Sequence, residues 1–307
     1  MTRLGILTPI YAPFMESLTQ DYQTTFLWQD ADPADLEVLV SDGTKPIDGA
    51  RMDRYPSLTL IALLSVGYDS VDIPAANERG IRVTHTPGAM SDDVANLALA
   101  LTINALRRLP EADRYVRDQQ WPIKELMKTC HGLAGAKAGV LGLGRIGTAI
   151  AYRLQACGAV LAYHARNERP DAPWRYEPDL IALARWARVL VIACPGGEST
   201  HHLVDHEIIH AIGPEGVLVN IGRGSVVDED AMIAALQSGA LGNVGLDVYA
   251  NEPHVPDALC QIERAALAPH IGSQTHHALG AMARMVRANI DSVLKGDGPL
   301  NPCDSVV

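Results

Sequence analysis

The chain is poor in aromatic residues and cysteines, and it lacks any long hydrophobic run. Only 5% of its 307 residues are aromatic, and its five cysteines include no C-x-x-C pair. This spacing argues against a zinc ribbon or a disulfide framework. The N-terminus lacks a basic segment followed by a long apolar core, and no apolar run reaches the length that spans a membrane. We therefore expect a cytoplasmic protein that does not associate with membranes.

Positive charge is also scarce, because 25 lysines and arginines stand against 36 aspartates and glutamates, a formal net charge of −11. Such a chain offers no basic face for nucleic acid, so an anionic ligand has to be attracted by local groups. Hydrophobic residues make up 48% and charged residues 20% of the chain, which is ordinary for a globular protein. The length favours two domains over one.

A glycine-rich stretch follows an apolar run that ends at Leu141. Gly142, Gly144 and Gly147 stand at G-x-G-x-x-G spacing, and the residues up to Leu154 then have helical periodicity. Between a strand and a helix, such glycines allow a tight turn, the approach of the backbone to a pyrophosphate, and close packing of helix on strand. The alternative is a purely structural turn. We favour a dinucleotide site, with a loop of Gly142, Leu143, Gly144, Arg145, Ile146 and Gly147.

The strand expected at residues 159–163 indicates which dinucleotide binds. In NAD sites, an acidic residue about 20 positions after the first glycine accepts a hydrogen bond from the ribose 2′-hydroxyl. Here His164 stands 22 residues after Gly142 (164 − 142). The residues that follow it include Arg166, Asn167 and a second arginine. Arginine can bind a 2′-phosphate with a charge-assisted fork, although a solvated basic turn would have the same composition. We predict that His164, Arg166 and Asn167 favour NADP(H), with NAD(H) still usable.

Short apolar runs alternate with helical or loop segments, which predicts an α/β fold with parallel sheets. The expected strands are residues 4–8, 36–40, 58–64, 81–84, a run ending at 141, 159–163, 189–194, 217–221, 243–248 and 266–268. Helices are expected at 91–106, 146–154 and 280–294. Residues 111–136 are interpreted as a polar, irregular excursion and residues 171–179 as a proline-rich loop.

The glycine fingerprint comes only after residue 140, so the N-terminal part is expected to be a separate α/β domain that supplies the substrate side. We predict a discontinuous substrate-binding domain of residues 1–95 plus 284–307 and a dinucleotide-binding domain of residues 96–283. Both would be doubly wound parallel sheets of the Rossmann or flavodoxin type, with the active-site cleft between them.

The loop from Ser65 to Asp72 follows a buried strand, so it lies at a strand's carboxyl end, where α/β folds bind ligands. Gly67 permits an exposed turn whose N–H groups, with that of Val66, could hold a carboxylate. An ordinary strand-to-helix turn, with Asp69 and Asp72 as helix caps, fits the same residues equally well.

Three polar residues stand at or just after the carboxyl ends of expected strands: Arg223, Glu252 and His270. In a doubly wound domain these ends converge on the cofactor crevice. Arginine can hold the carboxylate or carbonyl of an α-keto acid, and histidine can donate a proton to the carbonyl oxygen. A glutamate beside the imidazole would raise its pKa and keep it protonated near neutrality. Taken alone, each of these residues is more often a structural loop residue than a catalytic one.

We expect no metal site. The pairs His201-His202 and His276-His277 are adjacent in sequence, and neighbours do not share a helix face. A serine hydrolase is also disfavoured, because no G-x-S-x-G motif occurs.

Six motifs combine these features, and through them the chain resembles the D-2-hydroxyacid dehydrogenases along nearly its whole length. The motifs are SVGYDSVD (65–72), VTHTPGAMSDDV (83–94), GLGRIG (142–147), NIGRGSVVD (220–228), GLDVYANEP (245–253) and PHIGS (269–273). Within the family, the chain looks most like the NADPH-preferring glyoxylate/hydroxypyruvate reductases, on Tyr163–Arg166 and the Ala193–Gly197 loop.

The resemblance implies that Arg223, Glu252 and His270 are the catalytic residues. For the substrate it implies binding by Val66, Gly67, Arg223 and His270. For the cofactor it implies further contacts with Ala193, Cys194, Pro195, Thr200, Ile221, Asp247, His270 and Gly272. It also implies a homodimer built on the helix at 91–106 and the 111–136 arm.

The resemblance therefore predicts an NADPH-dependent reductase that converts small 2-keto acids, glyoxylate or hydroxypyruvate, into D-2-hydroxy acids. Hydride transfer would be coupled to proton transfer by the histidine. One alternative is the same chemistry on a larger 2-keto acid, such as 2-ketogluconate or an arylpyruvate. A remote alternative is a non-enzymatic dinucleotide-sensing binding protein, which the complete set of catalytic residues disfavours.

Overall fold

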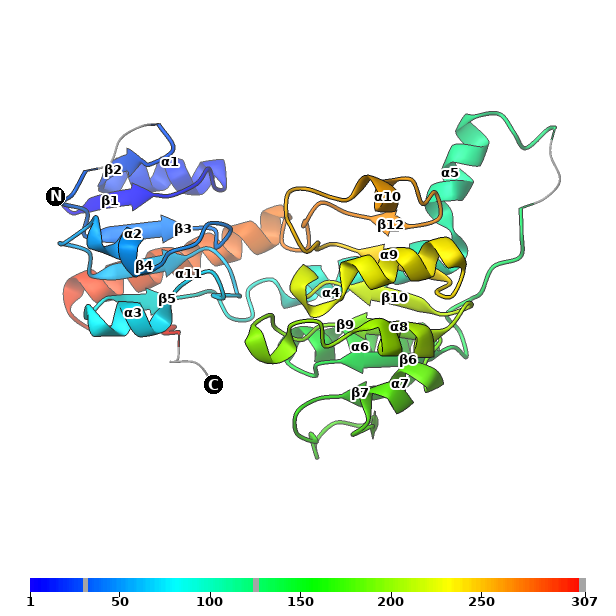
Figure 1. Cartoon of the computed structure of the whole chain (residues 1–307). Coiled ribbons are helices and arrows are strands. Elements are labelled where there is room, and N and C mark those ends of the chain that lie inside the picture. Colours follow the sequence, from blue (N-terminus) through cyan, green and yellow to red (C-terminus); the bar gives the residue numbers. More distant parts are fainter. Residues whose placement is uncertain (30–32, 124–126, 304–307) are drawn as a thin grey trace. The chain divides into compact units, whose positions relative to one another are not determined.

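The computed structural model describes residues 1–29, 33–123 and 127–303, and the chain divides into two compact units (Figure 1). The first unit is Met1–Met90 with Gln274–Val307, and the second is Ser91–Ser273. This division lies five and ten residues from the predicted boundaries (95 − 90 and 283 − 273). Both predicted boundaries fall inside a long helix, Ser91–Arg107 or His276–Lys295, and each of these helices lies within a single unit.

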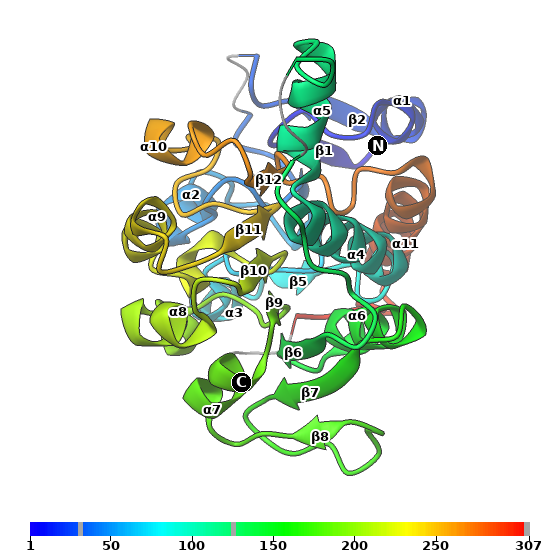
Figure 2. The same ribbon diagram turned by 90° about the vertical axis from the view of Figure 1, so that its right-hand side faces the viewer.

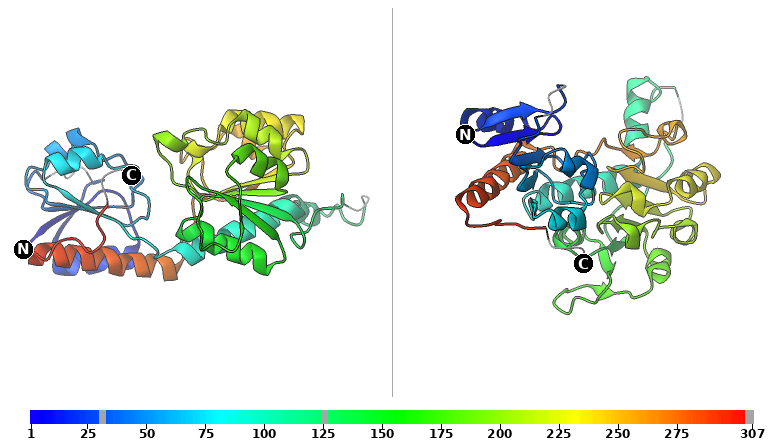
Figure 3. Two further views of the ribbon diagram at one scale, coloured as in Figure 1. Left: turned by 90° about the horizontal axis from the view of Figure 1, so that it is seen from below. Right: turned by 60° about the vertical axis from the view of Figure 1, so that its left-hand side comes forward.

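The first unit is built on a five-stranded parallel sheet with strand order β2-β1-β3-β4-β5. Its strands are β1 (Arg3–Ile6), β2 (Gln23–Phe26), β3 (Val38–Ser41), β4 (Leu60–Leu63) and β5 (Arg82–Thr84), and its helices are α1 (Ala12–Asp21), α2 (Gly49–Asp53), α3 (Ile73–Glu78) and α11 (His276–Lys295). Successive residues of a strand point to opposite faces. Val38 and Val40 pack with α1 and α11, whereas Leu39 packs with α2 and α3. Figure 3 shows these helix pairs on opposite faces of the sheet.

The second unit is built on a seven-stranded parallel sheet with strand order β12-β11-β10-β9-β6-β7-β8. Its strands are β6 (Lys137–Leu141), β7 (Val160–His164), β8 (Arg175–Tyr176), β9 (Val189–Ile192), β10 (Val217–Asn220), β11 (Asn243–Leu246) and β12 (Ala266–Leu267). Its helices are α4 (Ser91–Arg107), α5 (Leu109–Arg117), α6 (Arg145–Ala156), α7 (Leu180–Trp186), α8 (His206–Ile212), α9 (Glu229–Ser238) and α10 (Asp257–Cys260). Helices α7, α8 and α9 share one core cluster with the sheet. Helix α4 approaches β11 closely because Gly245 has no Cβ, which would lie 3.0 Å from the Cβ of Leu101.

The ten predicted strands correspond to β1, β3–β7 and β9–β12, which confirms an α/β fold with two parallel sheets. Strand β2 was missed because its sequence, QTTF, is polar. Strand β8 lies inside the predicted proline-rich loop and pairs with β7 at the sheet edge (Figure 2). The excursion predicted at 111–136 contains most of α5, a nine-residue helix with four charged residues, none of whose residues is buried in the single chain. Residues 124–126 of that excursion lie outside the described residues.

The longest helices are amphipathic. In α11, the buried residues Ala278, Met282, Val286, Ile290 and Val293 recur at spacings of three and four, and the last four pack in one core cluster with the first sheet. This helix starts four residues before the predicted 280–294 segment (280 − 276). Among residues 1–29, 33–123 and 127–303, none of the helices combines the length and the apolar character that a membrane crossing requires.

Candidate active site

The glycine fingerprint connects β6 to α6, as the strand–turn–helix interpretation predicted. Gly142 has φ +93°, and a Cβ there would lie 2.7 Å from the backbone nitrogen of Cys194. A Cβ at Gly147 would overlap the carbonyl oxygen of Gly142. The first position therefore requires glycine for the turn, and the third requires it for the packing of helix on strand.

The middle of this loop is open. A Cβ added to Gly144 would meet no heavy atom within 4 Å, and Gly144 is the N-cap residue of α6 without a side-chain hydrogen bond to the helix. Free N–H groups and the helix dipole at such an end favour an anion. The loop thus fits a cofactor pyrophosphate, and the contacts predicted for Leu143, Arg145 and Ile146 stay predictions.

The end of β7 and the turn that follows it contain the residues predicted to favour NADP(H) over NAD(H). His164 is half-buried, and its Nδ1 lies 2.9 Å from the carbonyl oxygen of Glu177, so this nitrogen carries the proton and Nε2 is left for a ligand. Arg166 and Asn167 are exposed, and no hydrogen bond or ion pair joins them to the described part of the chain. Their contact with a 2′-phosphate stays a prediction.

The loop after β9 passes beside the glycine loop, because the backbone of Cys194 is the group that a Cβ at Gly142 would meet. Thr200 ends a short 3-10 helix (Glu198–Thr200), and its Oγ1 donates to the carbonyl oxygen of Pro195 at 2.8 Å. Burial raises the pKa of the Cys194 thiol to about 11, so this cysteine serves packing rather than nucleophilic chemistry. The predicted cofactor contacts of Ala193, Cys194, Pro195 and Thr200 are compatible with this arrangement and stay predictions.

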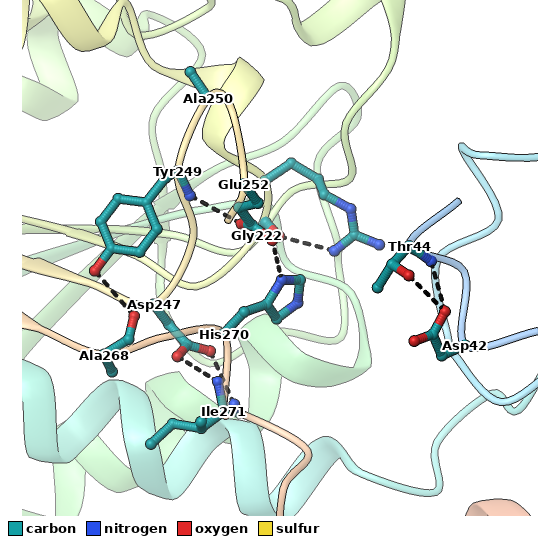
Figure 4. A network of polar contacts seen from close by, with 12 residues as sticks. Asp42, Thr44, Gly222, Asp247, Tyr249, Ala250, Glu252, Ala268, His270 and Ile271 are labelled. Carbon is teal, nitrogen blue, oxygen red and sulfur yellow. Dashed lines mark hydrogen bonds and ion pairs between the residues drawn. The ribbon is translucent and has the colours of Figure 1, made fainter. Parts of the chain in front are cut away.

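His270 and Glu252 form a direct pair (Figure 4). His270 Nδ1 lies 2.6 Å from Glu252 Oε2, and Glu252 Oε1 accepts a hydrogen bond of 3.0 Å from the backbone N–H of Tyr249. The Tyr249 hydroxyl in turn donates to the carbonyl oxygen of Ala268 at 3.0 Å. Both carboxylate oxygens are therefore held, and the imidazole is oriented with Nδ1 toward Glu252.

The charges around this pair favour a protonated imidazole. The hydrogen bond to Glu252 raises the pKa of His270, and it outweighs the opposing effects of burial and of the charge of Arg223. Burial of Glu252 acts to raise its pKa, but the bonds from His270 and from the Tyr249 N–H, together with the charge of Arg223, bring it below its ordinary value. Arg223 thus lies close enough to influence both partners, so the structure brings the three predicted catalytic residues together.

Arg223 is presented by a turn that follows β10. The Asn220 side chain donates from Nδ2 to the carbonyl oxygen of Arg223 at 2.9 Å and accepts from the N–H of Gly222 at 3.0 Å. The stem of Arg223 lies against Gly196, where a Cβ would approach its Cγ to 2.8 Å. Asn220 is 1% exposed and was not predicted as a site residue. The sequence feature that could have identified it is its position two residues before the Gly222-Arg223-Gly224 turn.

Asp247 supports the segment that carries His270. Its Oδ1 accepts from the N–H of Ile271 at 2.7 Å and its Oδ2 from the N–H of Gly272 at 2.9 Å (Figure 4). Burial raises the pKa of Asp247. His270 has φ +53°, a conformation uncommon outside glycine and often found at functional sites. The cofactor contacts predicted for Ile221, Asp247 and Gly272 stay predictions.

The predicted substrate loop belongs to the first unit. Ser65 Oγ donates to the carbonyl oxygen of Gly67 at 2.7 Å, and His85 Nδ1 lies 2.9 Å from that of Val66. The N–H groups of Val66 and Gly67 have no acceptor among the described residues. Asp72 caps α3 by accepting from its first turn, as the structural alternative predicted, whereas Asp69, the other predicted cap, is not the N-cap residue of this helix. The two interpretations are thus compatible, and carboxylate binding stays a prediction.

One histidine pair was overlooked in the expectation of no metal site. His206 and His210 stand at H-E-x-x-H spacing on α8, with ring centroids 3.9 Å apart, and His210 Nδ1 is bonded to the His206 carbonyl oxygen at 2.9 Å. Zinc sites use three or four protein ligands. Within the described residues, no group of three or more histidines, cysteines, aspartates or glutamates could hold a metal ion.

Comparisons with known proteins extend over nearly all of the chain. The family model described as "D-isomer specific 2-hydroxyacid dehydrogenase, NAD binding domain" matches residues 99–272. Glyoxylate/hydroxypyruvate reductase A of Arabidopsis thaliana is 42% identical over 267 residues, which cover 87% of this chain and 85% of that protein. Hydroxyphenylpyruvate reductase of Plectranthus scutellarioides is 39% identical over 284 residues, covering 92% of this chain and 90% of that protein.

A solved structure is similar over the whole length. It is the NADPH-dependent glyoxylate/hydroxypyruvate reductase of Sinorhizobium meliloti in complex with NADP and malonate. The TM-score is 0.92 at 35% identity, and the match covers 100% of this chain and 99% of that chain.

Proposed function

Because the chain belongs to the D-isomer-specific 2-hydroxyacid dehydrogenase family, a family of oxidoreductases, we propose that it reduces small 2-keto acids to D-2-hydroxy acids with NADPH. Glyoxylate and hydroxypyruvate are the proposed substrates. The observation that carries the proposal is the His270–Glu252 pair at 2.6 Å, in which the imidazole pKa is raised. This pair supplies the proton that reduction of a carbonyl requires.

His270 is the proton donor in this reaction. Its Nδ1 is engaged by Glu252, which leaves Nε2 for the carbonyl oxygen of the substrate. A bound NADPH would supply the hydride for the carbonyl carbon. His270 gives its proton to the carbonyl oxygen, so the C=O bond becomes an alcohol and His270 is left neutral. The His270 side chain is 43% exposed, which allows solvent to return the proton.

Arg223 is the proposed anchor of the keto acid. Its guanidinium can bind the carboxylate or the carbonyl oxygen, and the Asn220 turn and Gly196 hold its backbone and stem. The N–H groups of Val66 and Gly67 are further proposed donors to the carboxylate, because the Ser65 and His85 contacts fix their carbonyl groups.

The preference for NADPH is testable at Arg166. We expect Arg166→Ala to weaken NADPH binding by about 1.5–3 kcal/mol, or roughly ten- to a hundredfold in Kd, because a charge-assisted contact with the 2′-phosphate is lost. NADH binding should stay within about twofold. Fluorescence titration with both cofactors measures the two Kd values. Arg185→Ala, which removes an exposed arginine on α7, is the matched control. Equal losses for NADH would contradict the proposed contact.

The pair also predicts a pH dependence. Reduction needs protonated His270, so kcat/KM should be constant at low pH and fall as the pH rises through the raised pKa. Glu252→Gln removes the main cause of that raised value, while burial and Arg223 still lower it. The fall should therefore move to lower pH. Oxidation of the D-2-hydroxy acid needs neutral His270 and should show the opposite slope. An unchanged pH profile in Glu252→Gln would contradict the proposed coupling.

The substrate is tested by an absorbance assay at the nicotinamide band, crossing NADPH and NADH with glyoxylate, hydroxypyruvate, pyruvate, 2-ketogluconate and phenylpyruvate. Fast NADPH loss with glyoxylate and hydroxypyruvate is expected. The similarity to hydroxyphenylpyruvate reductase supports an arylpyruvate as the second candidate, and activity confined to phenylpyruvate would favour it. If neither NADPH nor NADH were oxidised with any of the five acids, the proposed reaction would be overturned and a dinucleotide-sensing protein would be favoured.

We also propose a homodimer. Large apolar side chains of α5 and of the segment after it are exposed in the single chain, namely Leu109 (41%), Val116 (56%), Trp121 (65%) and Ile123 (76%). A row of such residues on α5 and the segment after it is typical of a surface that a partner covers. Light scattering, which gives the molar mass of the particle in solution, tests whether the protein is a dimer.

A further inference from the structure

The turn of residues 165–169, which follows β7, is fixed to the sheet at both ends. At its start, the carbonyl oxygen of Ala165 accepts a hydrogen bond of 3.2 Å from the Tyr176 hydroxyl. At its end, the N–H of Arg169 donates to the Tyr163 hydroxyl at 2.8 Å, and the same hydroxyl donates to the carbonyl oxygen of Arg169 at 3.2 Å. One phenol therefore holds both backbone groups of Arg169.

Tyr163 can act on a ligand only through this turn. Its side chain is 1% exposed, so it has no surface to offer to a cofactor. It lies opposite Tyr176 in the register of β7 and β8, and the two ring centroids are 5.4 Å apart. The Tyr163 hydroxyl both donates to and accepts from the backbone of Arg169, so this buried oxygen has its hydrogen-bonding partners inside the core.

The side chain of Arg169 links the turn to the glycine loop. Its Nη1 donates to the carbonyl oxygen of Leu143 at 3.2 Å, and its Nε lies 3.7 Å from Asp171 Oδ1. Between the two fixed ends, Arg166 and Asn167 are exposed. A loop with anchored ends and a solvent-facing arginine is preorganised, because little conformational entropy remains to be lost when an anion binds.

We propose that Tyr163, supported by Tyr176, is a positioning residue that sets the preference for a 2′-phosphorylated cofactor. It does so by holding the 165–169 turn next to the glycine loop, so that Arg166 faces the 2′-phosphate. This inference rests on the proposed use of NADPH. It adds a residue of the sheet interior to the determinants of cofactor choice.

Tyr163→Phe tests the inference, because it keeps the ring and removes only the hydroxyl. Calorimetry with 2′,5′-ADP and 5′-AMP compares adenosine ligands with and without the 2′-phosphate, and needs neither keto acid nor turnover. We expect 2′,5′-ADP and NADPH to bind about three- to tenfold more weakly, while 5′-AMP and NADH change by less than about twofold. Tyr176→Phe should shift the same ratio in the same direction and provides a second variant.

Tyr152→Phe is the matched control. This tyrosine of α6 is 55% exposed, its ring contacts Trp174, and its hydroxyl has no hydrogen bond among the described residues. Its variant should bind all four ligands as the wild type does. Equal weakening of 2′,5′-ADP and 5′-AMP in Tyr163→Phe, or an unchanged ratio in both tyrosine variants, would overturn the inference. A wild-type protein that binds the two nucleotides equally would instead refute the proposed NADPH preference.

Discussion

Replacing His270 by alanine is expected to lower kcat for keto-acid reduction by about a hundredfold to ten-thousandfold, the range of general acid catalysis. The variant loses the group whose raised pKa keeps a proton available, and Glu252 is left without its partner at 2.6 Å. NADPH should still bind with a Kd within about twofold of the wild-type value, because the glycine loop proposed to hold the pyrophosphate does not depend on the imidazole. Single-turnover absorbance and fluorescence titration separate these two quantities.

His202→Ala is a suitable control for this variant. His202 belongs to the same unit and also has a left-handed backbone, with φ +49° against +53° for His270. The substitution therefore imposes a similar backbone change without touching the His270–Glu252 pair. We expect His202→Ala to retain turnover. A fully active His270→Ala enzyme would exclude the proposed acid role, even if all other features of the site were retained.

The parts of the site that depend on local sequence were predictable. The spacing of Gly142, Gly144 and Gly147 predicts a strand–turn–helix, in which Gly142 and Gly147 stand where a Cβ would collide with backbone and Gly144 leaves the loop open. Arg223 and His270 were predictable for a topological reason, since residues after the carboxyl ends of parallel strands converge. The family resemblance added Asp247, whose bonds to the backbone of the His270 segment no spacing rule reveals.

The parts that depend on contacts across the fold were missed. Tyr163 belongs to an apolar strand, and the residues next to it in sequence do not indicate that its hydroxyl bonds to the backbone of Arg169. Helix α5 and strand β8 were missed because four of the nine residues of α5 are charged and β8 has only two residues, Arg175 and Tyr176. The predicted domain boundaries fell inside α4 and α11, because amphipathic helices give no sign of the sheet they pack on.

A second large effect is expected for Arg223→Ala, which should lower kcat/KM for the keto acid by about two orders of magnitude. The charge-assisted bonds to the substrate are lost, so most of the effect should lie in KM. NADPH binding should change little, because the glycine loop is formed without this side chain. Steady-state kinetics with glyoxylate at saturating NADPH measures the change.

Arg223→Lys distinguishes charge from geometry. Lysine keeps a positive charge and an aliphatic stem against Gly196, but it lacks the planar fork, so it should recover only part of kcat/KM. A further readout is the pKa of His270, which is raised overall although the charge of Arg223 acts to lower it. In Arg223→Ala this opposing effect is absent, so the pH at which reduction falls should move upward, whereas in Arg223→Lys it should stay nearer the wild-type position. If KM, kcat and the pH profile were all unchanged in Arg223→Ala, the arginine would have no part in the reaction, and the substrate anchor would have to be sought among the N–H groups of Val66 and Gly67.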